Sequence, residues 1–219
     1  MVRTAVLVSG GGLNLQALID ASMFGEMPDC GLSAVISSNP DAYALKRAER
    51  AGIPAYVVDR ALFPSQTVFG FAILDKLRDL DIELVVLAGF NCELTQPILK
   101  HYSGRIIDTY SSLVPAFTDA GLSGQGIQEA ALAAGVKLSG ATVHFVADDP
   151  NARAIILQKA VAVRENDTPA SLQLRILEEA ESLILPRAVA LFCAGRLSFA
   201  NGAVHIAGDQ SAGIETLTK

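Results

Sequence analysis

Short apolar runs alternate with segments of helical spacing along the first hundred residues, and this alternation limits the fold to one class. The runs at 4–9, 32–38, 55–59 and 83–90 have the length of strands. Two of them, VLVSG and VVLAG, are continuously apolar, which is typical of strands covered on both faces. A helix is expected from about Asn14, and further helical patterns lie in DAYALKRAERAG and SQTVFGFAILDKLRDL. The sequence therefore predicts βαβ units and an α/β fold with a mostly parallel sheet.

The second half of the chain has a different pattern. RIIDTY, GATVHFV and AIILQKAVAV read as strands joined by long connections. Residues 168–192 predict one long amphipathic helix, with Thr168 as its N-cap and Pro169 at its first position, where the missing N–H costs nothing. GRLSFANGAVHI predicts a terminal hairpin that turns at Asn201-Gly202. No repeat, linker or low-complexity segment interrupts the 219 residues, so we expect a single domain.

Composition narrows the function classes. Hydrophobic residues make up 51% of the chain and charged residues 18%, which indicates a compact globular protein. The net charge is −6 without a cluster of lysines and arginines, so nothing favours nucleic acid or an anionic membrane as a partner. The N-terminus lacks the features of a signal peptide. Three widely spaced cysteines suggest neither a metal site nor a disulfide framework and fit a reducing cytoplasm: Cys30, Cys92 and Cys193.

A glycine loop joins the first predicted strand to the first helix, in VLVSGGGLNLQALID. Glycines let backbone N–H groups approach a phosphate, and a helix N-terminus adds a favourable dipole. The loop does not match G-x-G-x-x-G. It is not a Walker A motif either, because it lacks the lysine that this motif requires. A tight turn with positive φ would also explain the glycines, so the loop alone leaves both interpretations open.

A second candidate site lies in GRIIDTYSSLVPAF, residues 104–117. We expect a short buried strand from Arg105 to Ile107 that runs into a polar bend at Asp108, Thr109 and Tyr110. Open α/β sheets bind their ligands at the carboxyl ends of strands. This bend is therefore a candidate site.

Five segments together resemble glycinamide ribonucleotide transformylase, also called phosphoribosylglycinamide formyltransferase: VLVSGGGLNLQALID, VVLAGF, SSLVPAF, GATVHFV and IILQKAVAV. The resemblance covers about Val6 to Leu197. It implies a Rossmann-like formyltransferase fold, with residues 1–100 holding a nucleotide phosphate and residues 101–219 completing the cleft. It also implies formyl transfer from 10-formyltetrahydrofolate to a glycinamide amine in purine biosynthesis, without a metal or a covalently bound cofactor.

The nucleotide side of the family's site is largely retained. The phosphate-binding positions of the family fall on Gly11, Gly12, Leu13 and Asn14. Leu13 is the departure, because the family has a small hydroxyl residue there. Glu181 matches the family glutamate that lies near the ribose hydroxyls. The resemblance thus implies a small phosphorylated nucleotide as ligand.

The catalytic side differs at every position. The family motif N-I-H-P-S/A-L-L/I-P reads D-T-Y-S-S-L-V-P at 108–115, so its asparagine and histidine become Asp108 and Tyr110. The family aspartate becomes Asn151. In the cofactor loop Arg153 replaces a glycine, and Glu93 puts a charge where the family has an apolar residue. Positions of the cofactor pocket fall on Phe90, Cys92, Leu94 and Asp148.

These substitutions bear directly on the chemistry. Formyl transfer builds negative charge on the formyl oxygen, which needs hydrogen-bond donors. An ionised Asp108 only accepts, and Tyr110, with a usual pKa of about 10, is a poor proton shuttle at neutral pH. We therefore expect a catalytically degenerate member of the family that keeps a nucleotide site. There are two alternatives. One is an active enzyme with a remodelled site, since Asp108 and Asn151 look like an exchange of carboxylate and carboxamide. The other is a related hydrolase. A homodimer or a pairing with an intact paralogue stays open.

Overall fold

The computed structural model describes residues 1–118, 124–146, 154–200 and 203–208. In this part of the chain the strands form one seven-stranded sheet in the order β3-β2-β1-β4-β5-β6-β7 and a two-stranded sheet, β8-β9. The strands are β1 Val2–Val8, β2 Cys30–Ser37, β3 Ala55–Val57, β4 Leu84–Leu87, β5 Ile106–Tyr110, β6 Leu138–Phe145, β7 Ala154–Ala162, β8 Leu197–Ala200 and β9 Ala203–Ile206.

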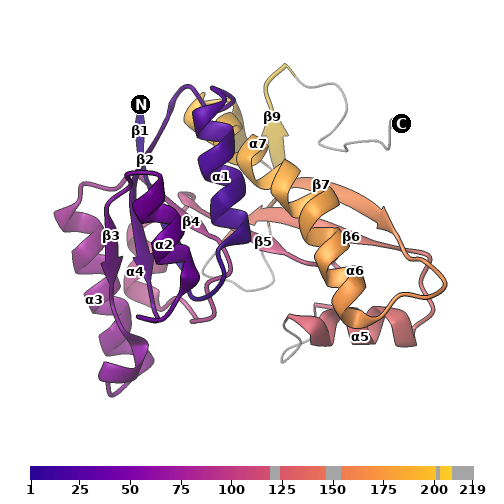
Figure 1. The fold of residues 1–219 in the computed structure, drawn as a ribbon. Coiled ribbons are helices and arrows are strands. Elements are labelled where there is room, and N and C mark those ends of the chain that lie inside the picture. The colour runs from indigo at the N-terminus through magenta and orange to yellow at the C-terminus, as the bar shows by residue number, and fades with distance from the viewer. Residues whose placement is uncertain (119–123, 147–153, 201–202, 209–219) are drawn as a thin grey trace.

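Helices connect the successive strands β1 to β5, as the crossover connections of a parallel sheet require (Figure 1). Their bounds are α1 Leu13–Met23, α2 Tyr43–Arg50, α3 Gln66–Asp79, α4 Gln96–His101, α5 Gln125–Ala133, α6 Pro169–Ile176 and α7 Ser182–Cys193, with a 3₁₀ turn at Arg60–Leu62. Strands β1 to β5 pair in parallel, whereas β5–β6 and β6–β7 pair antiparallel. The predicted α/β fold with a mostly parallel sheet and a C-terminal hairpin is confirmed. The hairpin's predicted turn, Asn201-Gly202, lies outside the described residues.

The sheet separates two hydrophobic clusters. Along β1, Val6 and Val8 face the cluster under α1, α2 and α7, whereas Ala5 and Leu7 face the cluster under α3 and α4. Residues that alternate between two buried faces explain why the sequence of this strand is continuously apolar. In Figure 1, α1 and α7 lie side by side over one face of the sheet. None of the helices in the described residues is both long enough and apolar enough to span a bilayer.

The end of β5 corrects one expectation. Asp108, Thr109 and Tyr110 do not form a polar bend after a short strand; they continue β5 and pair with residues 142–144 of β6. The sequence left two interpretations open, a strand over RIIDTY and a polar bend at its end, because the pairing partner lies more than thirty residues away. The antiparallel ladder satisfies the backbone N–H and C=O groups, so tertiary context overrides local propensity.

The predicted long helix at the end of the chain is continuous but not uniform. Thr168 caps α6: its hydroxyl accepts from the Ser171 N–H (3.1 Å), and the Ser171 hydroxyl accepts from the Thr168 N–H (3.0 Å). Between α6 and α7, residues Leu177–Glu181 form a π-helical segment. Such segments are frequent at functional sites, and this one ends on Glu181.

Candidate active site

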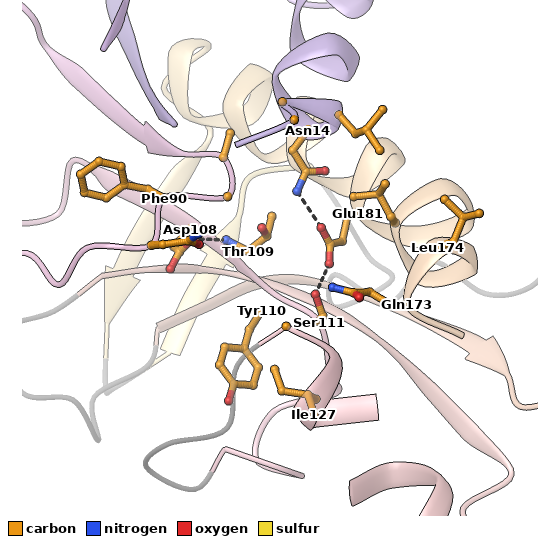
Figure 2. A pocket seen from close by; sticks show the side chains of 18 of the residues that line it. Asn14, Phe90, Asp108, Thr109, Tyr110, Ser111, Ile127, Gln173, Leu174 and Glu181 are labelled. Atoms are coloured by element: carbon orange, nitrogen blue, oxygen red, sulfur yellow. Dashed lines mark hydrogen bonds between the residues drawn. The ribbon is translucent and has the colours of Figure 1, made fainter. Parts of the chain in front are cut away.

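A cavity of about 570 Å³ lies beyond the carboxyl ends of β1 and β4 (Figure 2). Its walls come from the β1–α1 loop, the loop after β4, the end of β5, the start of α5 and one face of the α6–π–α7 helix. The lining residues are Gly11, Gly12, Leu13, Asn14, Ala88, Gly89, Phe90, Asn91, Asp108, Thr109, Tyr110, Ser111, Gly124, Ile127, Ala170, Gln173, Leu174, Leu177 and Glu181. Both candidate sites of the sequence therefore border one cavity.

The glycine loop is held tightly against α2. Gly12 is the N-cap of α1 and has a φ of 72°, the left-handed region that favours glycine. A Cβ on Gly12 would stand 2.7 Å from Ala44 Cβ and 2.9 Å from Ala44 Cα. The Ala44 N–H donates to the Gly10 carbonyl (3.0 Å), and Arg47 Nε donates to the Gly11 carbonyl (2.8 Å). The loop thus presents the first turn of α1, whose N–H groups have no intrahelical acceptor, to the cavity.

A buried polar network forms the floor of the cavity. Glu181 is only 4% exposed, and its Oε2 accepts from Asn14 Nδ2 (2.6 Å). The Ser111 hydroxyl donates to the other oxygen, Oε1. Gln128, which is fully buried, donates from Nε2 to the Ser111 carbonyl (2.8 Å). Figure 2 shows Asn14, Glu181 and Ser111 converging from three different elements.

The polar side chains at the end of β5 form hydrogen bonds within the protein. The Thr109 N–H donates to Asp108 Oδ1 (2.8 Å), and the Tyr110 hydroxyl donates to the Phe117 carbonyl (3.1 Å). His144, which sits opposite Asp108 in the β5–β6 ladder, is 8% exposed and donates from Nδ1 to the Phe145 carbonyl (3.0 Å). Both Asp108 and Tyr110 line the cavity, so the structure brings these positions together with the glycine loop.

The predicted cofactor positions divide into two groups. Phe90 lines the cavity and stacks on Phe69 at a centroid distance of 6.4 Å. Cys92 and Leu94 are not among the lining residues; they pack into the hydrophobic cluster under α3 and α4. Glu93, expected to charge the cavity wall, is exposed and does not line it. The remaining predicted positions lie outside the described residues: Asp148 and Asn151.

Several residues of the site escaped the sequence reasoning. Ser111 enters the sequence analysis only as a motif position, and Gln128 does not enter it, although both help to hold Glu181. Gln173, Leu174 and Leu177 also line the cavity. Helical spacing could have found them, because they lie one and two turns before Glu181 on the same helix face. Ser111 gave no comparable signal, since its contact with Glu181 spans 70 residues.

The described lining carries two carboxylates, Asp108 and Glu181, and no lysine, arginine or histidine. An anionic ligand group would therefore depend on backbone donors and the dipole of α1. No group of three or more His, Cys, Asp or Glu side chains that could hold a metal occurs among the described residues.

Comparisons with known proteins agree with this geometry. A family model described as formyl transferase matches residues 2–189. The phosphoribosylglycinamide formyltransferase of Haemophilus influenzae is 35% identical over 208 residues, which cover 95% of both chains. The crystal structure of glycinamide ribonucleotide transformylase 1 from Symbiobacterium toebii superposes with a TM-score of 0.87 at 42% identity, covering 94% of each chain.

Other relatives are much longer. The human trifunctional purine biosynthetic protein adenosine-3 is 40% identical over 193 residues, which cover 88% of this chain and 18% of the human protein. The chain thus spans less than a fifth of the trifunctional proteins that it matches.

Proposed function

Because this chain belongs to the phosphoribosylglycinamide formyltransferase family, we propose that it binds a small phosphorylated nucleotide and transfers formyl groups weakly or not at all. The glycine loop supports the first part, since it retains backbone donors at a helix N-terminus and is fixed by Ala44 and Arg47. The substituted positions on β5 support the second part. The protein is then a family member that retains a ligand site after its catalytic chemistry has been lost.

One observation carries the proposal: the hydroxyl of Tyr110 donates its hydrogen bond to the Phe117 carbonyl rather than into the cavity. An acyl-transfer site needs a donor about 3 Å from the oxygen that becomes negative. Tyr110 can serve only if it gives up this hydrogen bond. Asp108, when ionised, accepts hydrogen bonds and repels a developing oxyanion.

The expected loss is large. Removing a single oxyanion donor from an enzyme costs roughly 10²- to 10³-fold in kcat, and removing a general acid or base costs a similar factor. Losses within one catalytic unit are not additive, so we expect a total of at least about 10²-fold rather than the product. Tenfold in rate corresponds to about 1.4 kcal/mol of transition-state stabilisation.

Thermal shift with separate ligands tests the binding part. Glycinamide ribonucleotide should raise the Tm, because a ligand that binds only the native state stabilises it by mass action. A 10-formylfolate should leave the Tm unchanged. A shift with the folate and none with the nucleotide would reverse the proposal.

A working transferase with a remodelled site is the second candidate, and Asn91 favours it. This residue lines the cavity next to Phe90, and its backbone N–H donates to the Ser9 hydroxyl (2.9 Å), which fixes the loop after β4. Its carboxamide could donate to an oxyanion in place of the missing asparagine. If transfer is detected, Asn91→Ala should abolish it under this alternative. The control is Asn39→Ala, which replaces an asparagine that does not line the cavity.

A further inference from the structure

Two of the three cysteines meet in the hydrophobic cluster under α1, α2 and α7. Cys30 is the first residue of β2 and Cys193 is the last residue of α7, and α7 packs against β2. The Cys30 side chain belongs to this cluster, and the half-buried Cys193 packs against it. The two thiols form a hydrogen bond with each other. The fold thus brings together two cysteines that lie far apart in the sequence.

Thr4 on β1 helps to hold this pair in place. It is fully buried, and its hydroxyl oxygen accepts from the Cys30 thiol at 3.4 Å. The same hydroxyl donates to the Val2 carbonyl (3.2 Å), so the backbone of β1 fixes its orientation. It also lies within hydrogen-bond reach of Cys193. Two strands and a helix therefore each contribute one side chain to a single cluster, in which the two sulfur atoms already face each other.

The third cysteine lies on the other side of the sheet. Cys92 packs into the hydrophobic cluster under α3 and α4, whereas Cys30 and Cys193 lie in the cluster under α1, α2 and α7. Two cysteines can form a disulfide only when their Cα atoms are within about 7 Å of each other. Because the sheet separates Cys92 from the other two, the cysteines that can be joined within one chain are Cys30 and Cys193.

The two thiols of the pair differ in exposure and in acidity. Cys30 is 2% exposed, so an oxidant does not reach it directly, whereas Cys193 is half-buried. The hydrogen bond from Cys193 stabilises the Cys30 thiolate and lowers the pKa of Cys30 below its ordinary value. The same contact raises the pKa of Cys193, which slows its own reaction with an oxidant. Cys193 is therefore the group that meets the oxidant, and Cys30 is the nucleophile that then attacks it.

We propose that Cys30 and Cys193 are a redox modification site, at which a small disulfide such as oxidised glutathione produces a reversible intramolecular disulfide. Cys193, as its thiolate, attacks one sulfur of oxidised glutathione, which releases one glutathione and leaves a mixed disulfide on Cys193. The Cys30 thiolate then attacks Cys193 Sγ, forms the Cys30–Cys193 bond and releases the second glutathione. The protein gives up two protons and two electrons, and these convert oxidised glutathione into two glutathione thiols. The inference is independent of the proposed function.

Equilibration of the full chain with millimolar oxidised glutathione tests the proposal. Mass spectrometry of peptides prepared without reduction should find a linked Cys30–Cys193 pair. The number of free thiols in the denatured protein should fall from three to one. The oxidised protein should have a Tm about 5–15 °C higher, because a disulfide that closes a long loop constrains the unfolded chain. Dithiothreitol should restore both the three thiols and the original Tm.

Single variants separate the two steps. Cys193→Ser should leave Cys30 as a free thiol, because no exposed cysteine remains beside it. Cys30→Ser should trap the mixed disulfide, so that one glutathionyl group stays on Cys193 and the Tm does not rise. Cys92→Ser is the matched control, since this cysteine lies on the opposite side of the sheet. It should give the same linked pair and the same rise in Tm as the unmodified protein.

Three results for the unmodified protein would overturn the proposal. In the first, all three thiols stay free in oxidised glutathione. In the second, a stable mixed disulfide remains on Cys193, which would show that Cys30 does not reach Cys193 Sγ in bonding geometry. In the third, the linked peptide contains Cys92, which would show that the contact between Cys30 and Cys193 does not decide which cysteines are joined.

Discussion

Gly12→Ala is expected to destabilise the protein by about 2–5 kcal/mol. Gly12 has a φ of 72°, and an L-residue in this left-handed region costs about 1–2 kcal/mol. The added Cβ would also stand 2.9 Å from Ala44 Cα, which belongs to the backbone of α2 and cannot rotate away. Overpacking of this kind typically costs a further 1–3 kcal/mol. The substitution therefore disrupts the contact between α2 and the glycine loop.

Urea denaturation followed by circular dichroism measures this loss, with the midpoint shifted at an unchanged m value. Gly11→Ala is the matched control, because a Cβ there meets no atom within 4 Å and the φ of Gly11 is not positive. We expect its free energy of unfolding to stay within about 0.5 kcal/mol of the unmodified protein. Equal effects of the two substitutions, in either direction, would refute the reasoning that assigns a special backbone role to Gly12.

Two further predictions concern the α6 cap and the loop. Arg175 pairs with the carboxylate of Asp167, whose side chain is 3% exposed, and its hydrogen bonds hold the pKa of Asp167 below the usual 3.8. Because the pKa is lowered in the folded protein, the ionised Asp167 stabilises the fold above about pH 4, and this stabilisation is lost as the pH falls. Asp167→Asn should therefore lower the free energy of unfolding by about 2 kcal/mol at pH 7 and by progressively less in acid. The midpoints of urea denaturation measure this. Leu13→Ser should tighten nucleotide binding several-fold by adding a neutral donor of about 1 kcal/mol, with Leu174→Ser as control; unchanged or weaker binding in titration would contradict this.

The parallel half of the fold could be predicted because each of its signals is local. Val6 and Leu7 face opposite buried surfaces, so the strand is apolar at every position. Thr168 and Pro169 likewise mark the start of α6 within a few residues. In these segments local pattern and final packing agree, which is why their elements were placed nearly at the correct residues.

The candidate site could be predicted only in part. The glycine loop and Asp108 were found, since both follow strands whose pattern is clear. The contact of Asn14 with Glu181 joins residues 167 positions apart, and no local pattern reveals it. For the same reason the sequence left Thr109 between a strand and a bend, because its pairing with β6 is what makes it a strand. Non-local hydrogen bonds, rather than propensities, decide this part of the molecule.

Formyl transfer from 10-formyltetrahydrofolate to glycinamide ribonucleotide, measured at saturating concentrations of both, tests the central claim most directly. Enzymes ordinarily turn over at about 1–10³ s⁻¹. With Tyr110 donating to the Phe117 carbonyl and Asp108 lining the cavity, we predict turnover at least about 100-fold below the lower end of that range. Turnover of about 1 s⁻¹ or faster would contradict the account and favour the remodelled transferase.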